Sequence, residues 1–149
     1  HKYDMFLRDS GWDFTDNIVI GHSSGSTTIL NLLQQDWFPR IKTAVFVGLF
    51  VNNDLIENNP PDWYKPGQFK DLFPTEGFDF NKVIQKSDQR FVIHSDNDPY
   101  CDPQLAIDTA KRIDAKIRII PGGKHLSKNS GGYTELPELI DFLDANQAL

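Results

Sequence analysis

The sequence predicts an α/β fold in which a parallel sheet is covered by helices on both faces. Short, continuously apolar segments alternate along the chain with amphipathic segments of helical periodicity. Strands that are apolar throughout are typical of parallel sheets, because both of their faces are buried against helices. Ligand sites in such sheets lie at the carboxyl ends of the strands, so we look for functional side chains there.

The expected elements fit a single domain at residues 1–149. Apolar runs predict strands at 17–21, 43–49, 90–94 and 116–120. Helical periodicity predicts helices at 25–35, 103–113 and 135–146, and a short helix at 2–8. The helix at 103–113 has a clear start, because Asp102 can cap it and Pro103 suits its first turn.

One segment, residues 51–80, interrupts this alternation with prolines and interleaved aromatic residues. A long irregular insertion is usually functional or disordered, and its aromatic content argues against disorder. We interpret it as a lid-like insertion over a pocket, with Trp63 and Phe73 as candidate substrate contacts. A surface loop whose aromatic side chains simply pack on the domain is an equally weighted alternative.

The first chemical motif is Gly21-His22-Ser23-Ser24-Gly25, which matches G-x-S-x-G between a predicted strand and a predicted helix. This setting is that of a nucleophile elbow, in which a strained turn exposes Ser23 and the flanking glycines avoid clashes. The N–H of Ser24, at the helix start, can then hold an oxyanion, and His22 is a candidate substrate contact. The alternative is a Gly/Ser-rich turn that binds phosphate, although it lacks the lysine of a P-loop.

A carboxylate and a histidine follow the next two relevant strand ends. Asp98 lies in the sequence SDNDPY after the strand at 90–94, and His125 ends PGGKH after the strand at 116–120. A serine hydroxyl needs an adjacent base that is itself oriented by a carboxylate, and the order Ser, acid, His is that of α/β-hydrolases. Asp96 competes with Asp98 for the acid role, but it also suits a hydrogen bond to backbone in the turn.

Four segments of the chain, IVIGHSSG, FVIHSDNDPYCD, IIPGGKHL and LPELIDFL, resemble the small single-domain serine hydrolases of the α/β-hydrolase superfamily, the family that includes retinoblastoma-binding protein 9. The resemblance covers roughly residues 17–143. It implies a catalytic triad with Ser23 as nucleophile, Asp98 as acid and His125 as base, and it favours Asp98 over Asp96.

The chain departs from this family pattern in three places. Relatives often carry an apolar residue where Ser24 stands and glycine where Lys124 stands. The family fold opens with a strand and a loop that supplies a second oxyanion N–H, whereas only residues 1–16 precede the strand at 17–21 here. We therefore expect the N-terminal strand or strands and half of the oxyanion hole to be absent, which leaves an exposed sheet edge. Loss of one oxyanion donor costs about a hundred- to a thousandfold in rate.

Composition excludes several classes of partner. Fifteen basic residues lie scattered among 21 acidic ones, for a net charge of −6, which argues against nucleic acid or an anionic membrane. A single cysteine, Cys101, predicts no internal disulfide and fits a reducing, cytoplasmic compartment; we interpret it as a packed residue rather than a reactive thiol. No metal-binding spacing of His and Cys occurs, so we expect neither a metal nor a cofactor.

The sequence thus favours a serine hydrolase that cleaves a small-molecule ester or amide through an acyl-enzyme on Ser23. The alternative is a catalytically weak or inactive hydrolase-fold module that binds a protein through residues 63–80, because fold does not guarantee activity. A related transferase or lyase that uses the same three residues also stays open.

Overall fold

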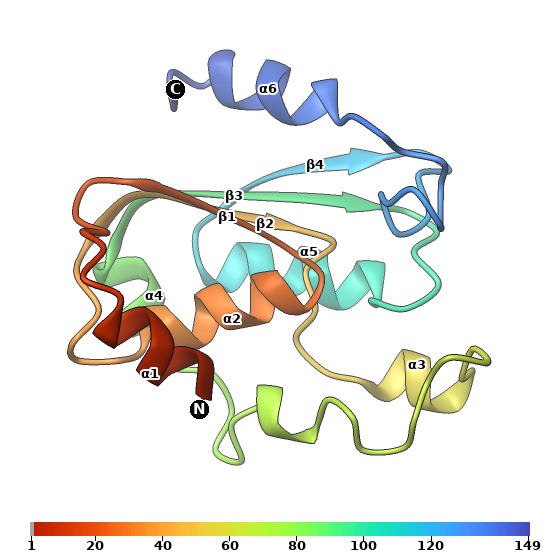
Figure 1. The fold of residues 1–149 in the computed structure, drawn as a ribbon. Coiled ribbons are helices and arrows are strands. Elements are labelled where there is room, and N and C mark those ends of the chain that lie inside the picture. Colours follow the sequence, from red (N-terminus) through yellow and green to blue (C-terminus); the bar gives the residue numbers. More distant parts are fainter. Residues whose placement is uncertain (1) are drawn as a thin grey trace.

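A computed structural model describes residues 2–149 and shows four parallel strands in one sheet (Figure 1). The strands are β1 (Ile18–His22), β2 (Ile41–Val47), β3 (Ser87–Ser95) and β4 (Lys116–Ile120), and they lie in the order β1-β2-β3-β4. Each pairs in parallel with its neighbour, so all four carboxyl ends meet at one edge of the sheet. The predicted parallel α/β sheet is confirmed.

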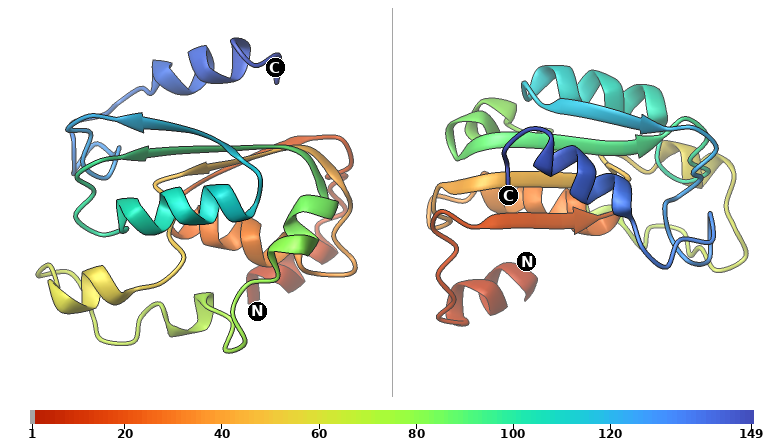
Figure 2. Two further views of the ribbon diagram at one scale, coloured as in Figure 1. Left: turned by 180° about the vertical axis from the view of Figure 1, so that it is seen from behind. Right: turned by 90° about the horizontal axis from the view of Figure 1, so that it is seen from above.

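Helices cover both faces of this sheet, unequally. The helices are α1 (Lys2–Asp9), α2 (Ser24–Leu33), α3 (Asp54–Asn58), α4 (Phe80–Gln85), α5 (Pro103–Arg112) and α6 (Pro137–Asp144), with a 3₁₀ turn at Lys70–Leu72. Figures 1 and 2 show α2, α4 and α5 on one face and α6 on the other. Within the described residues, no helix is long and apolar enough to cross a membrane.

The core forms two apolar layers, one on each side of the sheet. Alternate residues of the central strands serve the two layers: Phe46 and Val92 pack toward α2 and α5, whereas Val45 and Phe91 pack toward α6. All four are almost completely buried. This double burial explains why the central strands are apolar without alternation.

Strand β1 lies at one edge of the sheet, and no other strand of the described chain pairs with its outer side. Ile20 is therefore 51% exposed, although its neighbour in register, Val45, is completely buried. The expected exposed sheet edge is present.

Most element boundaries differ by one to three residues from the sequence-based expectation, and the structure explains two of these differences. Strand β3 begins at Ser87, because its polar first residues pair with β2 through backbone groups that an apolar pattern does not report. Arg90 fits inside this strand, since its guanidinium donates to the carbonyl of Ile113 at 2.6 Å. Helix α6 begins two residues later than expected, with Pro137 in its first turn.

The 51–80 insertion contains α3 and the 3₁₀ turn and lies near the carboxyl edge of the sheet (Figure 1). It packs on Phe50, whose ring lies 5.2 Å from that of Phe69 and 5.1 Å from that of Phe73, measured between centroids. Ile56 is buried in the same cluster. Apolar packing therefore orders the insertion against the domain.

Candidate active site

The turn between β1 and α2 holds Ser23 in a strained conformation. Its φ is 57° and its ψ is −121°, a region that non-glycine residues seldom adopt. The Ser23 N–H donates to the carbonyl of Val47 at 2.9 Å, and the Ser26 N–H donates to the carbonyl of Ser23 at 2.9 Å. The chain thus reverses sharply at Ser23, as a nucleophile elbow requires.

The two glycines of the motif play different parts. A Cβ on Gly21 would lie 2.4 Å from the carbonyl oxygen of Gly25 and 2.8 Å from the nitrogen of Ser26, so no side chain fits there. A Cβ on Gly25 would meet no atom within 4 Å. The expectation that both glycines avoid clashes is therefore wrong for Gly25, whose backbone is the surface that Gly21 contacts.

Asp98 and His125 form a buried hydrogen-bonded pair. The Asp98 carboxylate accepts from Nδ1 of His125 at 2.8 Å and from the backbone N–H groups of Tyr100 and Cys101 at 2.9 and 3.1 Å. Asp98 is 4% exposed and His125 is 8% exposed. Because Nδ1 bonds to the carboxylate, the other ring nitrogen, Nε2, remains for chemistry in the pocket.

The loops that carry this pair are joined by further hydrogen bonds. Oδ1 of Asp96 accepts from the N–H of Gly122 at 2.8 Å, and Oδ1 of Asn97 accepts from the N–H of Lys124 at 2.8 Å. Asp96 thus has the structural role that the sequence suggested, and Asp98 alone of the two carboxylates meets His125. Asp102 caps α5, as expected.

The backbone of Lys124 has a conformation that suits glycine, the residue that the family resemblance led us to expect there. Its φ is 50°, in the left-handed region that favours glycine. Leu126, on the other side of His125, also has a positive φ of 49°. His125 is therefore presented by a strained loop, as Ser23 is.

Two further histidines support His125 and Asp98. Nε2 of His22 donates to the carbonyl of His125 at 2.8 Å, and the two rings lie 4.8 Å apart between centroids. His94 accepts from the Leu49 N–H at Nδ1 and donates to the carbonyl of Cys101 from Nε2. Burial lowers the pKa of both His22 and His94, so each is held neutral. The position of His94 at a strand end already suggested a hydrogen bond to the following loop, which its bond to Cys101 confirms. Sequence reasoning missed the role of His22, because its partner lies 103 residues away along the chain.

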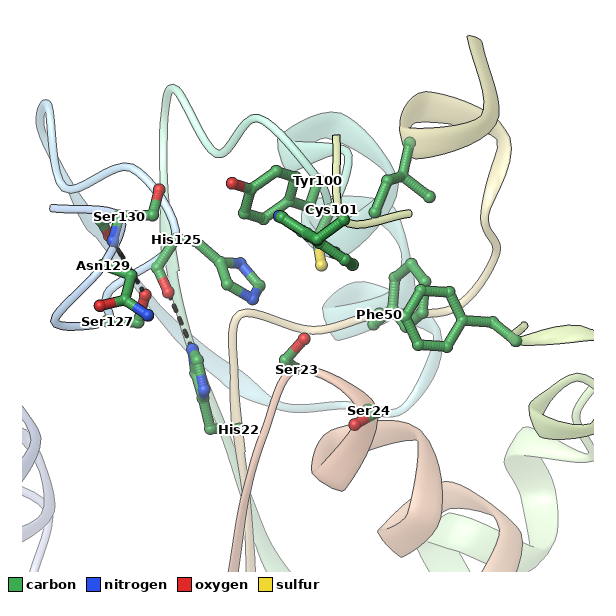
Figure 3. A pocket seen from close by; sticks show the side chains of 13 residues that line it. His22, Ser23, Ser24, Phe50, Tyr100, Cys101, His125, Ser127, Asn129 and Ser130 are labelled. Carbon is green, nitrogen blue, oxygen red and sulfur yellow. Dashed lines mark hydrogen bonds between the residues drawn. The ribbon is translucent and has the colours of Figure 1, made fainter. Parts of the chain in front are cut away.

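Ser23 faces the same space as His125. Figure 3 shows the Ser23 hydroxyl pointing toward the region between the His125 ring and the Cys101 thiol. In the part of the chain that the structure describes, no hydrogen bond joins the Ser23 hydroxyl to His125. Such bonds between nucleophile and base often tighten only when substrate binds.

A pocket of about 370 Å³ opens above these residues. Ile56, Trp63 and Phe69 of the insertion line it, together with Phe50. The insertion is therefore a wall of the pocket, which favours the lid-like interpretation over a mere surface loop. Phe73 is not among the lining residues; it packs behind Phe50, so its expected substrate contact is corrected to a supporting role.

Cys101 also lines the pocket, which the sequence did not reveal. It is 2% exposed, and burial, with the charge of Asp98, raises the pKa of its thiol well above the ordinary value. The packed, unreactive interpretation thus fits its environment. The signal that could have placed it is its position three residues after Asp98, within a turn that Asp98 organises.

The donor atoms of Asp98, Cys101 and His125 lie within 4.8 Å of one another, close enough to hold a metal ion. The donors do not suit that use. The Asp98 carboxylate already accepts three hydrogen bonds. Burial and the charge of Asp98 raise the pKa of the Cys101 thiol, which opposes the loss of its proton that metal binding requires.

Comparison with known proteins shows the family of the chain. The model of the family described as "Serine hydrolase" matches residues 10–145. The YdeN protein of Bacillus subtilis (strain 168) is 33% identical over 76 residues, which are 51% of this chain and 40% of that protein. The matched segment thus spans well under half of that relative.

Solved structures show the same fold. The crystal structure of the ydeN gene product of B. subtilis superposes with a TM-score of 0.73 at 22% identity, covering 99% of this chain and 72% of that one. The esterase RhEst1 of Rhodococcus sp. ECU1013 superposes with a TM-score of 0.60 at 14% identity, covering 91% and 66%. At such identities the likeness concerns the fold alone.

Proposed function

Because this chain belongs to the serine hydrolase family, we propose that it hydrolyses small esters, or amides, through an acyl-enzyme on Ser23. The observation that carries the proposal is the buried hydrogen bond between Asp98 and His125 beside a serine with φ of 57°. The pocket above them contains apolar side chains that suit an acyl group.

In the proposed reaction, Nε2 of His125 takes the proton of the Ser23 hydroxyl as its oxygen attacks the carbonyl carbon. The carbonyl π electrons move to the oxygen, and the tetrahedral intermediate then expels the alcohol, which receives the proton from His125. Water attacks the acyl-enzyme in the same way, releasing the acid and restoring Ser23. Asp98 orients the imidazole and stabilises its charged form.

The N–H of Ser24 is the proposed oxyanion donor. Ser24 is the first residue of α2, where the N–H groups of a helix have no partner within the helix and the helix dipole favours negative charge. This donor is a backbone group, so the Ser24 side chain is not required. The expectation that the chain supplies only half of an oxyanion hole remains a prediction.

A hydrolase-fold module that binds a protein remains the second candidate, with the aromatic insertion as its contact surface. Trp63 favours the binding module, because it is 52% exposed and could contact a partner. Ile56 and Phe69 argue for the enzyme instead, because they face the same pocket as Ser23. A transferase would share the site and pass the acyl group to an acceptor other than water, whereas a lyase would use the same three residues to cleave a bond by elimination. A cytoplasmic location also remains a prediction.

The test is hydrolysis of nitrophenyl butyrate by the wild-type chain, Ser23→Ala and Ser24→Ala. We expect Ser23→Ala to lose at least about a thousandfold in kcat/KM, because the nucleophile is removed. Ser24→Ala is the matched control and should retain most activity, since it keeps the N–H. Full activity of Ser23→Ala would refute the proposal, and a folded wild-type chain without activity would favour the binding module.

A further inference from the structure

The lining of the pocket is divided by chemistry. One part is apolar and comes from Phe50 and the insertion, whereas the other is polar and comes from Ser127, Asn129 and Ser130. Figure 3 shows these three polar residues on one side of the His125 ring and Phe50 on the other, with Tyr100 over the ring. His125 thus stands between an apolar subsite and a polar subsite.

The polar subsite is held in place by its own loop. The N–H of Ser127 donates to the carbonyl of Ser130 at 3.1 Å, and the N–H of Ser130 donates to the Ser127 carbonyl at 3.2 Å. Gly131 closes the loop at φ of 116°, where an added Cβ would lie 2.5 Å from the carbonyl oxygen of Gly123. The loop is therefore packed against the segment that presents His125.

The side chains of this loop differ in availability. The Ser127 hydroxyl is engaged internally, because it accepts from the N–H of Ser130 at 3.2 Å. Among the described residues, no hydrogen bond is made by the side chains of Asn129 and Ser130, which line the pocket. An amide and a hydroxyl are thus free to bind a polar ligand group.

The chemistry of the site places the acyl chain of the substrate in one subsite and the leaving alcohol in the other. His125 must return a proton to the leaving alcohol, so that alcohol lies next to Nε2. Ser24, the proposed oxyanion donor, begins α2 on the Phe50 side of Ser23 (Figure 3). With the carbonyl oxygen held there, the acyl chain enters the apolar subsite and the leaving alcohol points to the loop at 127–130.

We infer, on the basis of the proposed function, that the substrates are esters that join a short apolar acyl group to a hydroxylated alcohol, and that Asn129 and Ser130 bind the hydroxyl groups of that alcohol. Attack by Ser23 breaks the ester bond, the acyl group stays on Ser23 and the polyol leaves with the proton from His125. Water then releases the carboxylic acid. No further reactant is needed.

The test uses two esters that share butyrate and a three-carbon alcohol: glycerol monobutyrate and propyl butyrate. Both form the same acyl-enzyme, so a difference in kcat/KM reports the leaving-group side alone. We expect the glycerol ester to be preferred about tenfold, the scale of one or two partly exposed hydrogen bonds. Asn129→Ala and Ser130→Ala should each lower that preference about threefold, with little effect on propyl butyrate.

Lys128→Ala is the matched control, because Lys128 lies in the same loop, is exposed and does not line the pocket. This variant should keep the wild-type preference. Equal use of the two esters, or a preference that survives both Asn129→Ala and Ser130→Ala, would overturn the inference while Ser23-dependent hydrolysis upheld the proposed function. Absence of Ser23-dependent hydrolysis of either ester would overturn both.

Discussion

The two regions that build the pocket are held by different forces. The loops after β3 and β4 are joined by directional hydrogen bonds, in which Asp96, Asn97 and Asp98 each bond to one residue of the segment 122–125. The 51–80 insertion is held mainly by aromatic packing around Phe50. Hydrogen bonds fix the position of an atom closely, whereas apolar contacts tolerate repacking.

This difference suggests a division of labour. A proton transfer needs its donor and acceptor at a defined distance, so the chemistry is best placed on the hydrogen-bonded loops. An apolar acyl group needs only a cavity of suitable size, which the insertion can supply. Substitutions in the loops should therefore change the rate of reaction, and substitutions in the insertion should change the choice of substrate.

The largest expected effect is in the loops, at Asp98. Asp98→Asn should lower kcat by about ten-thousandfold, because an amide cannot stabilise the charged imidazole and can favour the wrong tautomer of His125. Asp96→Asn is the matched control; it retains an acceptor oxygen for the Gly122 N–H and should stay within about threefold of wild type. Similar losses in the two variants, measured by steady-state hydrolysis, would contradict the assignment of the acid.

The next effect concerns the elbow. Gly21→Ala should lower activity by at least about a hundredfold, because the added methyl group meets the backbone of Gly25 and displaces Ser23. Gly25→Ala adds the same methyl group where space is free and should retain activity. Ester hydrolysis together with thermal unfolding separates the two variants. If Gly21→Ala matched Gly25→Ala, the elbow would not depend on this close contact.

A smaller effect is expected in the insertion. Trp63→Ala removes part of the pocket wall and should raise KM for long acyl esters about fivefold with kcat nearly unchanged, since apolar contact contributes to uniform binding. Phe73→Ala, behind Phe50, should mainly lower the unfolding temperature. A large fall in kcat for Trp63→Ala, measured across a series of acyl lengths, would show that the insertion affects the reaction rate as well as the choice of substrate.

The smallest expected effect is a pH dependence of the unfolding temperature that comes from His94, at the end of β3. Burial lowers the pKa of His94 below 6.5, so the folded state keeps it neutral while the unfolded state takes up a proton. The contribution of neutral His94 to folding stability is complete above pH 6.5, and it is lost as the pH falls toward the pKa of His94 in the folded state. The unfolding temperature should therefore fall by a few degrees more between pH 7 and pH 5 in wild type than in His94→Gln. An identical fall in both would exclude His94 as a cause.

The sequence predicted the elements that carry local signals. Ser23, Asp98 and His125 each follow an apolar strand, and parallel strands bring such positions to one edge. The roles of His22 and Phe73 could not be predicted, because each depends on a group far along the chain: His22 bonds the backbone carbonyl of His125, and Phe73 packs on the Phe50 ring. The start of β3 was missed because backbone pairing leaves no apolar pattern.

Whether His125 activates Ser23 is tested by intact-mass labelling of the 149-residue chain with a fluorophosphonate, alongside Ser23→Ala and His125→Ala. A fluorophosphonate reacts far faster with a serine whose hydroxyl is activated by a base than with ordinary serines. We predict one adduct on the wild-type chain and none on either variant. A folded wild-type chain without an adduct, or an adduct that persists in Ser23→Ala, would contradict the role of Ser23 as an activated nucleophile.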